Sequence, residues 1–225
     1  MEKIVQKAKT KVDRVVKAGS VGKGTALSLK IDFDCVFFLE AGGVPEFFLE
    51  DMEDILMLNF GISADKKQKS LSFFHKGFYF GFLQALQDAK VALNDGSGEA
   101  QVSAALRSGQ RPNSAELVEG TVLFMKEQSS FAHTLARLLK FWSHSLLVPG
   151  FFNGRSYTME LLAVAAAEDV MGEDMLRAFR IALDKIRNYR SLSVIFERFY
   201  KKEEVPQKLK DSRPLYLTLP THGTT

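Results

Sequence analysis

Two aspartates, Asp32 and Asp34, stand on either side of Phe33 in an apolar stretch that alternates like a β-strand. Because residues two apart share a strand face, the two carboxylates project side by side, while Phe33 and Cys35 point the other way into the core. Neighbouring like charges cost energy unless a cation lies between them or both reach water. Mg²⁺, completed by substrate phosphates, is the cation that such a pair favours. The alternative is an edge strand with a solvated face.

A glycine-rich turn, KAGSVGKGT, precedes this strand. Its backbone N–H groups are suited to a phosphate, and Ser20 adds a hydroxyl donor. The turn is not a Walker loop, because Lys23 is followed by Gly24, and a dinucleotide fingerprint fails at Leu27. What remains is Gly-Ser, an interval of eleven residues, and then Asp-x-Asp on a strand. This order is typical of the polymerase-β-like nucleotidyltransferases.

The elements that must position these residues follow from periodicity. Residues 1–16 predict a helix with valines and isoleucine on one side, and residues 27–39 predict a strand. A helix is expected at residues 47–58 and further strands within residues 71–82, whose aromatic side chains are expected in the core.

The second half of the chain is helical by period. Apolar residues recur at three- and four-residue steps from Phe131 to Leu146, and again from Leu176 to Tyr189. The sequence therefore predicts an α+β protein with a mixed-sheet lobe flanked by helices, residues 1–110, and an α-helical bundle lobe, residues 111–225. The stretch from 94 to 116, rich in Gly, Ser and Asn, marks the boundary.

The composition is that of an ordinary soluble globular protein, with 225 residues, 46% hydrophobic and 25% charged. No apolar run is long enough to span a membrane, and no secretory signal is evident, so we expect no membrane association and a cytoplasmic location. One cysteine and four histidines exclude an internal disulfide and a zinc cluster. Basic residues dominate the first 25 positions, which predicts either a solvated face or a phosphate-facing surface.

Residues 17–39 resemble the 2'-5'-oligoadenylate synthetase family, whose members carry a GS-x-GKGT turn followed by paired aspartates and an apolar strand. The segments FAHTLARLLKFWSHSL, RSYTMELLAVAAAEDV and SRPLYLTLP are similar to further parts of the family, in order, whereas residues 40–115 match poorly. The resemblance implies a nucleotidyltransferase lobe packed on a helical lobe, with ATP in the cleft between them. It also implies that double-stranded RNA activates synthesis of 2'-5'-linked oligoadenylate, in innate antiviral defence.

The resemblance assigns roles to individual residues. Gly19 and Ser20 would hold the donor triphosphate. Asp32 and Asp34 would be the catalytic carboxylates and would ligate Mg²⁺.

Base recognition and RNA binding are assigned in the same way. Tyr157 matches a family tyrosine that stacks on a base, while Ser156 replaces the family's glutamine and leaves base selectivity open. Arg155 is assigned to phosphate from its charge and position alone. A footprint for double-stranded RNA is expected from Lys17, which matches an RNA-facing lysine, and from the basic residues before it, Lys9, Lys11 and Arg14.

Two-metal phosphoryl transfer in this family needs a third aspartate on a neighbouring strand. The best counterpart of the family's FDVLPAFDA segment is FGFLQALQDA, which puts Gly81 in the aspartate's place, or Phe82 after a shift of one residue. Asp88 and Glu160 are possible replacements, although Glu160 also fits a structural role on its helix. Two hypotheses follow: an RNA-responsive nucleotidyltransferase, or a catalytically silent relative that binds double-stranded RNA or nucleotide as a sensor or scaffold. A cyclic-dinucleotide synthase is a third possibility, which the GKGT turn and the YTMELL segment disfavour.

Overall fold

The computed structural model describes residues 6–28, 31–40, 45–67, 70–86, 118–145, 155–196 and 215–217. The chain divides into two compact units, one with Lys30–Val122 and the residues up to Gly22, the other with Lys23–Leu29 and Leu123–Pro220. The predicted lobe boundary at residue 110 lies outside the described residues. No helix among the described residues is long and apolar enough to cross a membrane.

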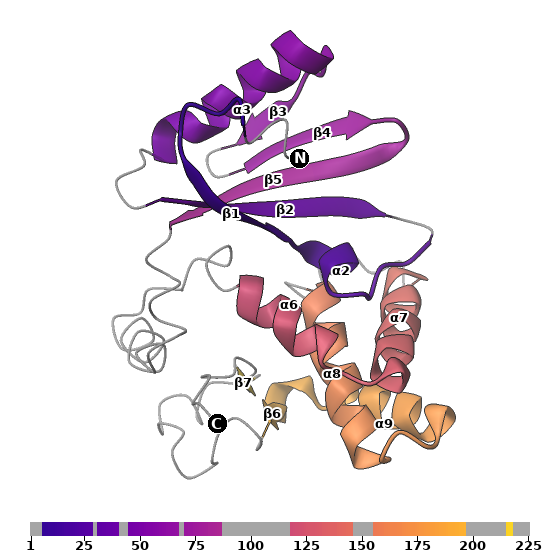
Figure 1. The fold of residues 1–225 in the computed structure, drawn as a ribbon. Helices are drawn as coiled ribbons and strands as arrows, with labels where there is room; N and C mark the ends of the chain where they lie inside the picture. The colour runs from indigo at the N-terminus through magenta and orange to yellow at the C-terminus, as the bar shows by residue number, and fades with distance from the viewer. Residues whose placement is uncertain are drawn as a thin grey trace. The chain divides into compact units, whose positions relative to one another are not determined.

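The first unit is built on a five-stranded mixed sheet (Figure 1). Its strands have the spatial order β1-β2-β5-β4-β3, in which β2 and β5 are parallel and the other neighbours antiparallel. The bounds of its strands and helices are β1 Val12–Lys17, α2 Gly19–Gly22, β2 Asp32–Leu39, α3 Pro45–Phe60, β3 Asp65–Lys67, β4 Ser70–His75 and β5 Phe78–Leu86.

The core of this sheet lies under α3, where Phe37, Phe48 and Phe82 pack together. The alternation of β2 explains this arrangement, because Cys35, Phe37 and Leu39 all turn to the α3 side. The strand at residues 27–39 and the helix at 47–58 are thereby confirmed, with shifted ends.

The helix predicted for residues 1–16 is wrong in the described part of that range, because residues 6–11 contain turns and bends and Val12–Lys17 is strand β1. The β-branched valines of this segment favour a strand, and β1 gains its hydrogen bonds by pairing with β2. The register shifts between Val12 and Arg14. This irregularity interrupts the two-residue alternation and leaves a spacing that imitates a helix.

The second unit is mainly helical, as predicted, and α7, α8 and α9 pack around one apolar core. The short strands β6 and β7, near the C-terminus of this unit, pair in parallel. The bounds of the remaining elements are α6 Val118–Lys126, α7 Ser130–Ser145, α8 Arg155–Asp169, α9 Met175–Arg187, η1 Tyr189–Ser191, β6 Ser193–Ile195 and β7 Leu215–Leu217. Helix α6 begins in the first unit and ends in the second.

Candidate functional site

The carboxylates of Asp32 and Asp34 lie on one face of β2, as the alternation predicts, and both side chains are half-buried. Cys35 follows on the opposite face, buried in the core beneath α3. Burial raises the pKa of the Cys35 thiol, and the neighbouring Asp34 carboxylate raises it further. Among these residues the two aspartates are therefore the ones that can offer oxygen ligands, on the face of β2 opposite to α3.

The glycine turn forms the short helix α2 and lies directly against Asp34. The Ala18 amide donates to the Asp34 carbonyl oxygen at 2.8 Å. Gly19 has a positive φ of +59°, and a Cβ built there would come within 2.1 Å of Asp34 Oδ2. Because only glycine allows both this backbone conformation and this approach, the first glycine of the turn is needed for the turn to lie against Asp34.

Gly81 lies on the other side of the same carboxylate. It pairs with Asp34 in the parallel β2–β5 ladder, and a Cβ built on it would lie 2.6 Å from Asp34 Oδ1. Phe82, the alternative in the alignment, is buried in the core and turns to the opposite face. Gly81 is therefore the residue that stands beside the carboxylate pair on the neighbouring strand.

The two carboxylates fit one Mg²⁺ ion, which is commonly held by one or two carboxylates together with substrate phosphates. The flanking glycines leave the carboxylate face without bulky side chains next to Asp34. In the part of the chain that the structure describes, no group of three or more His, Cys, Asp and Glu side chains could hold a metal ion. Asp88, one of the two candidate replacements, lies outside this part.

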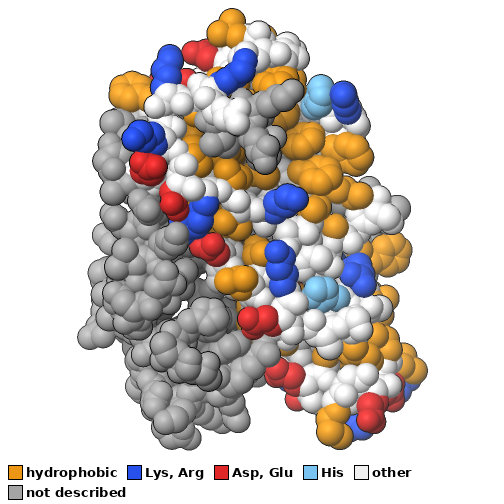
Figure 2. Space-filling model, in the orientation of Figure 1, with side chains coloured by type: hydrophobic (Ala, Val, Ile, Leu, Met, Phe, Trp, Pro, Cys, Tyr) orange, Lys and Arg blue, Asp and Glu red, His pale blue; other side chains and the backbone are white. Residues whose placement is uncertain are grey.

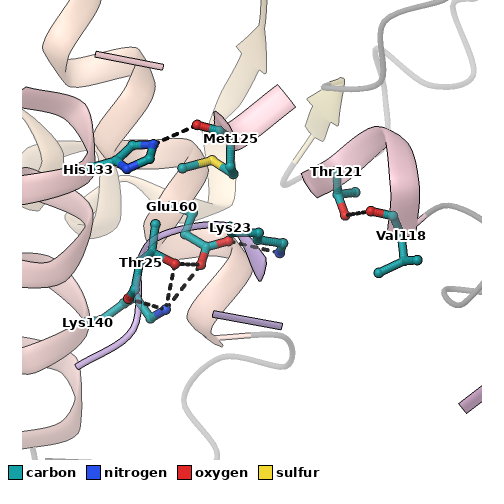
Figure 3. Close-up of polar contacts among 8 residues, drawn as sticks. All are labelled: Lys23, Thr25, Val118, Thr121, Met125, His133, Lys140 and Glu160. Carbon is teal, nitrogen blue, oxygen red and sulfur yellow. Dashed lines mark hydrogen bonds and ion pairs between the residues drawn. The ribbon is translucent and has the colours of Figure 1, made fainter. Parts of the chain in front are cut away.

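Glu160, the other candidate, lies in the second unit within a buried cluster of charged and polar groups (Figure 3). Its Oε1 accepts from Lys140 Nζ at 3.1 Å, and its Oε2 accepts from Lys23 Nζ at 3.0 Å. Thr25 completes the cluster, because its hydroxyl donates to Glu160 and accepts from Lys140. We name Lys23, Thr25, Lys140 and Glu160 the Glu160 cluster. These contacts fit the structural role on its helix that the sequence offered for Glu160 as the alternative to a replacement carboxylate.

The cluster is almost completely removed from water. Glu160 is 1% exposed and Lys140 3% exposed. Burial lowers the pKa of Lys140, and the opposing attraction of Glu160 raises it only in part. The Lys23–Thr25 segment is also held from outside the cluster, because Arg137 Nη1 donates to the Gly24 carbonyl oxygen at 2.9 Å. The family-like GKGT turn is thus fixed onto α7 and α8 by charge and hydrogen bonding.

Tyr157, the predicted base-stacking residue, lies on α8 one turn before Glu160 and is half-buried. Lys23 Nζ lies over its ring, 4.2 Å from the centroid. A base that stacks on Tyr157 must therefore use the other ring face or displace the ammonium group. Ser156 is exposed, and the side chain of Arg155 lies outside the described residues.

The basic residues assigned to RNA differ in how far their charges are already used. Arg14 binds Glu119 and Asp13, each with a closest distance of 2.7 Å, and its guanidinium lies 3.9 Å from the centroid of the Phe38 ring. The lysines of the set, Lys9, Lys11 and Lys17, are exposed, and Lys9 Nζ lies 3.9 Å from Asp51 Oδ1. The structure thus presents the three lysines to solvent, whereas Arg14 is engaged within the first unit.

Sequence reasoning did not single out Thr25 or Lys140. A signal was present, since Ala132, Ala136 and Lys140 follow one another at four-residue steps on α7. All three are buried, so this spacing places a lysine in the apolar stripe of the helix. A buried lysine needs a partner, and a search for a buried acid on a neighbouring helix would have pointed to Glu160.

Comparison with known proteins identifies the family. The family model described as "2'-5'-oligoadenylate synthetase 1, domain 2, C-terminus" matches residues 107–224, more than half of the chain. The chain is also similar to 2'-5'-oligoadenylate synthase 2 of Mus musculus, with 27% identity over an alignment of 251 residues. That alignment covers 92% of this chain and 34% of the mouse protein, so the chain spans about a third of its relative's length.

Solved structures agree on the fold. The structure of CdnC from E. coli MS115-1 with ATP has a TM-score of 0.63 at 16% identity, covering 91% of this chain and 67% of that chain. The Rhodothermus marinus CdnE c-UMP-AMP synthase, solved with Apcpp and Upnpp, has a TM-score of 0.55 at 15% identity, covering 83% of this chain and 74% of that chain. These identities support the α+β fold alone. The fold is that of the nucleotidyltransferases, and the family match shows that the chain belongs to the 2'-5'-oligoadenylate synthetase family.

Proposed function

We propose that this chain is a nucleotidyltransferase that joins ATP into 2'-5'-linked oligoadenylate. In this reaction a ribose hydroxyl oxygen attacks the α-phosphorus of ATP, and pyrophosphate leaves. The observation that carries the proposal is the position of Asp34, whose carboxylate shares a strand face with Asp32 and lies against Gly19 of the turn. A carboxylate pair can hold Mg²⁺ and backbone N–H groups can bind phosphate, so this arrangement supports phosphoryl transfer.

The residues of the chain would divide the work. Asp32 and Asp34 would hold Mg²⁺, which supplies charge neutralisation at the phosphates when bound. The backbone at Gly19 and the Ser20 hydroxyl would orient the triphosphate, and Tyr157 would stack on a base, with Arg155 assigned to phosphate.

Regulation belongs to the same proposal. Double-stranded RNA would bind the basic residues Lys9, Lys11 and Lys17, with Arg14 beside them, and would control the activity in the cytoplasm as part of innate antiviral defence. The exposure of the three lysines supports this assignment. The engagement of Arg14 with Glu119 makes it the weakest member of the set.

The test is a product assay on the full chain with ATP, MgCl₂ and long double-stranded RNA. We expect oligoadenylates that resist nucleases specific for 3'-5' linkages, and we expect none from Asp34→Asn, which removes a charge with little change in shape. Lys11→Gln should weaken RNA binding at low salt and reduce the salt dependence. Products from Asp34→Asn at the wild-type rate would contradict the proposed role of the carboxylates.

A second candidate function is supported by Gly81, which places no acid beside Asp34 on β5. In this reading the chain is a catalytically silent relative that binds double-stranded RNA or nucleotide as a sensor or scaffold. Loss of one ligand of the catalytic ion costs roughly 10³-fold in rate or more. The wild type would then bind RNA and make no product.

The variant Gly81→Asp separates the two candidates. Its Cβ would come within 2.6 Å of Asp34 Oδ1, and Gly19 closes the other side of that carboxylate, so Asp34 must rotate to admit the new side chain. If the missing acid is the only defect, activity should rise by about 10³-fold over the wild type. Gly81→Ala is the matched control, because it imposes the same contact without adding a ligand.

A further inference from the structure

The β4–β5 hairpin carries two aromatic side chains that the sequence placed in the core. Phe74 is 58% exposed and Tyr79 59% exposed, although their ring centroids lie only 4.9 Å apart. The two residues are directly paired across β4 and β5. Buried aromatic rings contribute large apolar areas to a core, so two contacting rings left in solvent form a ready surface for a ligand.

This aromatic pair lies on the same face of the sheet as the carboxylates. Directly paired residues point to one side, and residues two apart on a strand share a face. The registers of β2, β5 and β4 therefore define two neighbouring rows across the face, with Asp32, Tyr79 and Phe74 in the first and Asp34, Gly81 and Ser72 in the second.

The second row forms a low floor next to the aromatic pair. Gly81 has no side chain and Ser72 has a short one. The floor is therefore bounded by the carboxylates of Asp34 and of Asp65, which pairs with Ser72 on β3, and by the rings of Phe74 and Tyr79. The rows are about 7 Å apart along the strands. Tyr79 lies one strand and one row from Asp34, whereas Phe74 lies two strands and one row away, so a base that stacks on Tyr79 would hold its attached sugar about one row from Asp34.

The surroundings favour a nucleobase over an apolar protein segment. Hydrophobic side chains gather at the hairpin end of the sheet beside a histidine and a lysine (Figure 2). The two-residue turn contributes the exposed cation Lys76, whereas His75 pairs with Phe78 and lies on the opposite face of β4. Exposed aromatic rings with adjacent cations are the combination that binds single-stranded nucleic acid, since bases stack on the rings and cations meet the phosphates.

We propose that Phe74 and Tyr79 form a stacking site for a base near the end of a single-stranded oligonucleotide, on the carboxylate face of the sheet. The inference rests on the proposed nucleotidyl transfer and identifies its acceptor as a strand. The strand end would pass over Gly81 toward Asp32 and Asp34.

The test measures binding by the full chain to a fluorescein-labelled single-stranded oligoadenylate in MgCl₂ without ATP, so that no turnover is needed. We expect Phe74→Ala and Tyr79→Ala each to raise Kd roughly tenfold, as for loss of one stacked base. Tyr79→Phe keeps the ring and should bind as the wild type does. Phe47→Ala, which removes an exposed phenylalanine from α3, is the matched control.

Several results would overturn the inference. The stacking site is contradicted if Phe74→Ala binds the oligonucleotide as tightly as the wild type does, or if Phe47→Ala weakens binding equally. If AMP competes as strongly as the oligonucleotide, the site recognises a mononucleotide and not a strand. A concentration-dependent dimer that Phe74→Ala dissociates would show that the patch binds protein.

The same variants separate this inference from the proposed function. If binding depends on Phe74 but the wild type makes no product, nucleotidyl transfer fails and the base site stands. If Phe74→Ala makes product with the same acceptor KM as the wild type, the base site fails and nucleotidyl transfer stands.

Discussion

Removal of Glu160 should destabilise the helical unit strongly, because it leaves Lys140 buried without its countercharge. Glu160→Gln keeps the shape of the side chain and removes only the charge. Lys140 is 3% exposed, so water cannot replace the lost partner. Breaking a buried ion pair from one side costs about 3–5 kcal/mol. The amide can still accept one hydrogen bond, so we expect a loss near the lower end, about 3 kcal/mol.

The opposite truncation should cost less. In Lys140→Met, Glu160 keeps the ammonium of Lys23 at 3.0 Å and the Thr25 hydroxyl. We expect about 1–2 kcal/mol, together with a coupling energy of about 1–3 kcal/mol in the double-mutant cycle with Glu160→Gln.

Urea unfolding followed by tryptophan fluorescence measures these losses. Trp142 is the single tryptophan of the chain and packs against the core of the helical unit, with its ring 6.4 Å from that of Phe179. A loss of about 3 kcal/mol should lower the urea midpoint by roughly 1–2 M.

A surface pair of the same length provides the control. Lys185 Nζ lies 3.1 Å from Asp169 Oδ2, the same distance as in the buried pair, but the two side chains are 29% and 47% exposed. Lys185→Met should cost about 0–1 kcal/mol. A Glu160→Gln loss no larger than that of Lys185→Met would refute the reasoning from burial.

Three further predictions concern pH and backbone. Burial lowers the pKa of Lys140 below its unfolded value of 10.5, so the unfolded chain binds more protons in the alkaline range up to that value. The stability of the wild type relative to Lys140→Met should therefore rise with pH in the alkaline range just below 10.5 in urea titrations, and a fall would contradict the lowered pKa. Gly77→Ala should cost about 1 kcal/mol in thermal unfolding followed by circular dichroism, because φ is +88° and an added Cβ meets open space. Gly19→Ala should cost clearly more and abolish any product, because its Cβ also displaces Asp34, and equal losses in the two variants would show that the carboxylate yields freely.

The sequence predicted the elements whose pattern is local. The alternation of β2 placed Asp32 and Asp34 on one face, and the periodicity of α7 and α9 predicted the helical unit. The prediction from periodicity failed at β1, where the irregular register between Val12 and Arg14 masks the strand pattern. A local pattern also cannot show that the ring of Phe74 stays exposed, because that depends on which elements cover the sheet.

The candidate site was predictable only in part for the same physical reason. The turn and the carboxylates lie close together in the sequence, and their motif is recognisable. Two partners of Glu160 are distant in the sequence, since Thr25 is separated from it by 135 positions and Lys23 by 137. The position of Gly81 beside Asp34 became certain only through strand register, which an alignment with two possible offsets leaves open.

The burial of Cys35 has a practical consequence for experiments on this protein. Its thiol is the only one in the chain and adjoins Asp34 on β2, facing the core. A thiol reagent can reach it only when this strand transiently opens. The alkylation rate of Cys35 therefore measures how often strand β2 opens locally, without any engineered label. A ligand that binds Asp32 and Asp34 and stabilises the strand should lower that rate.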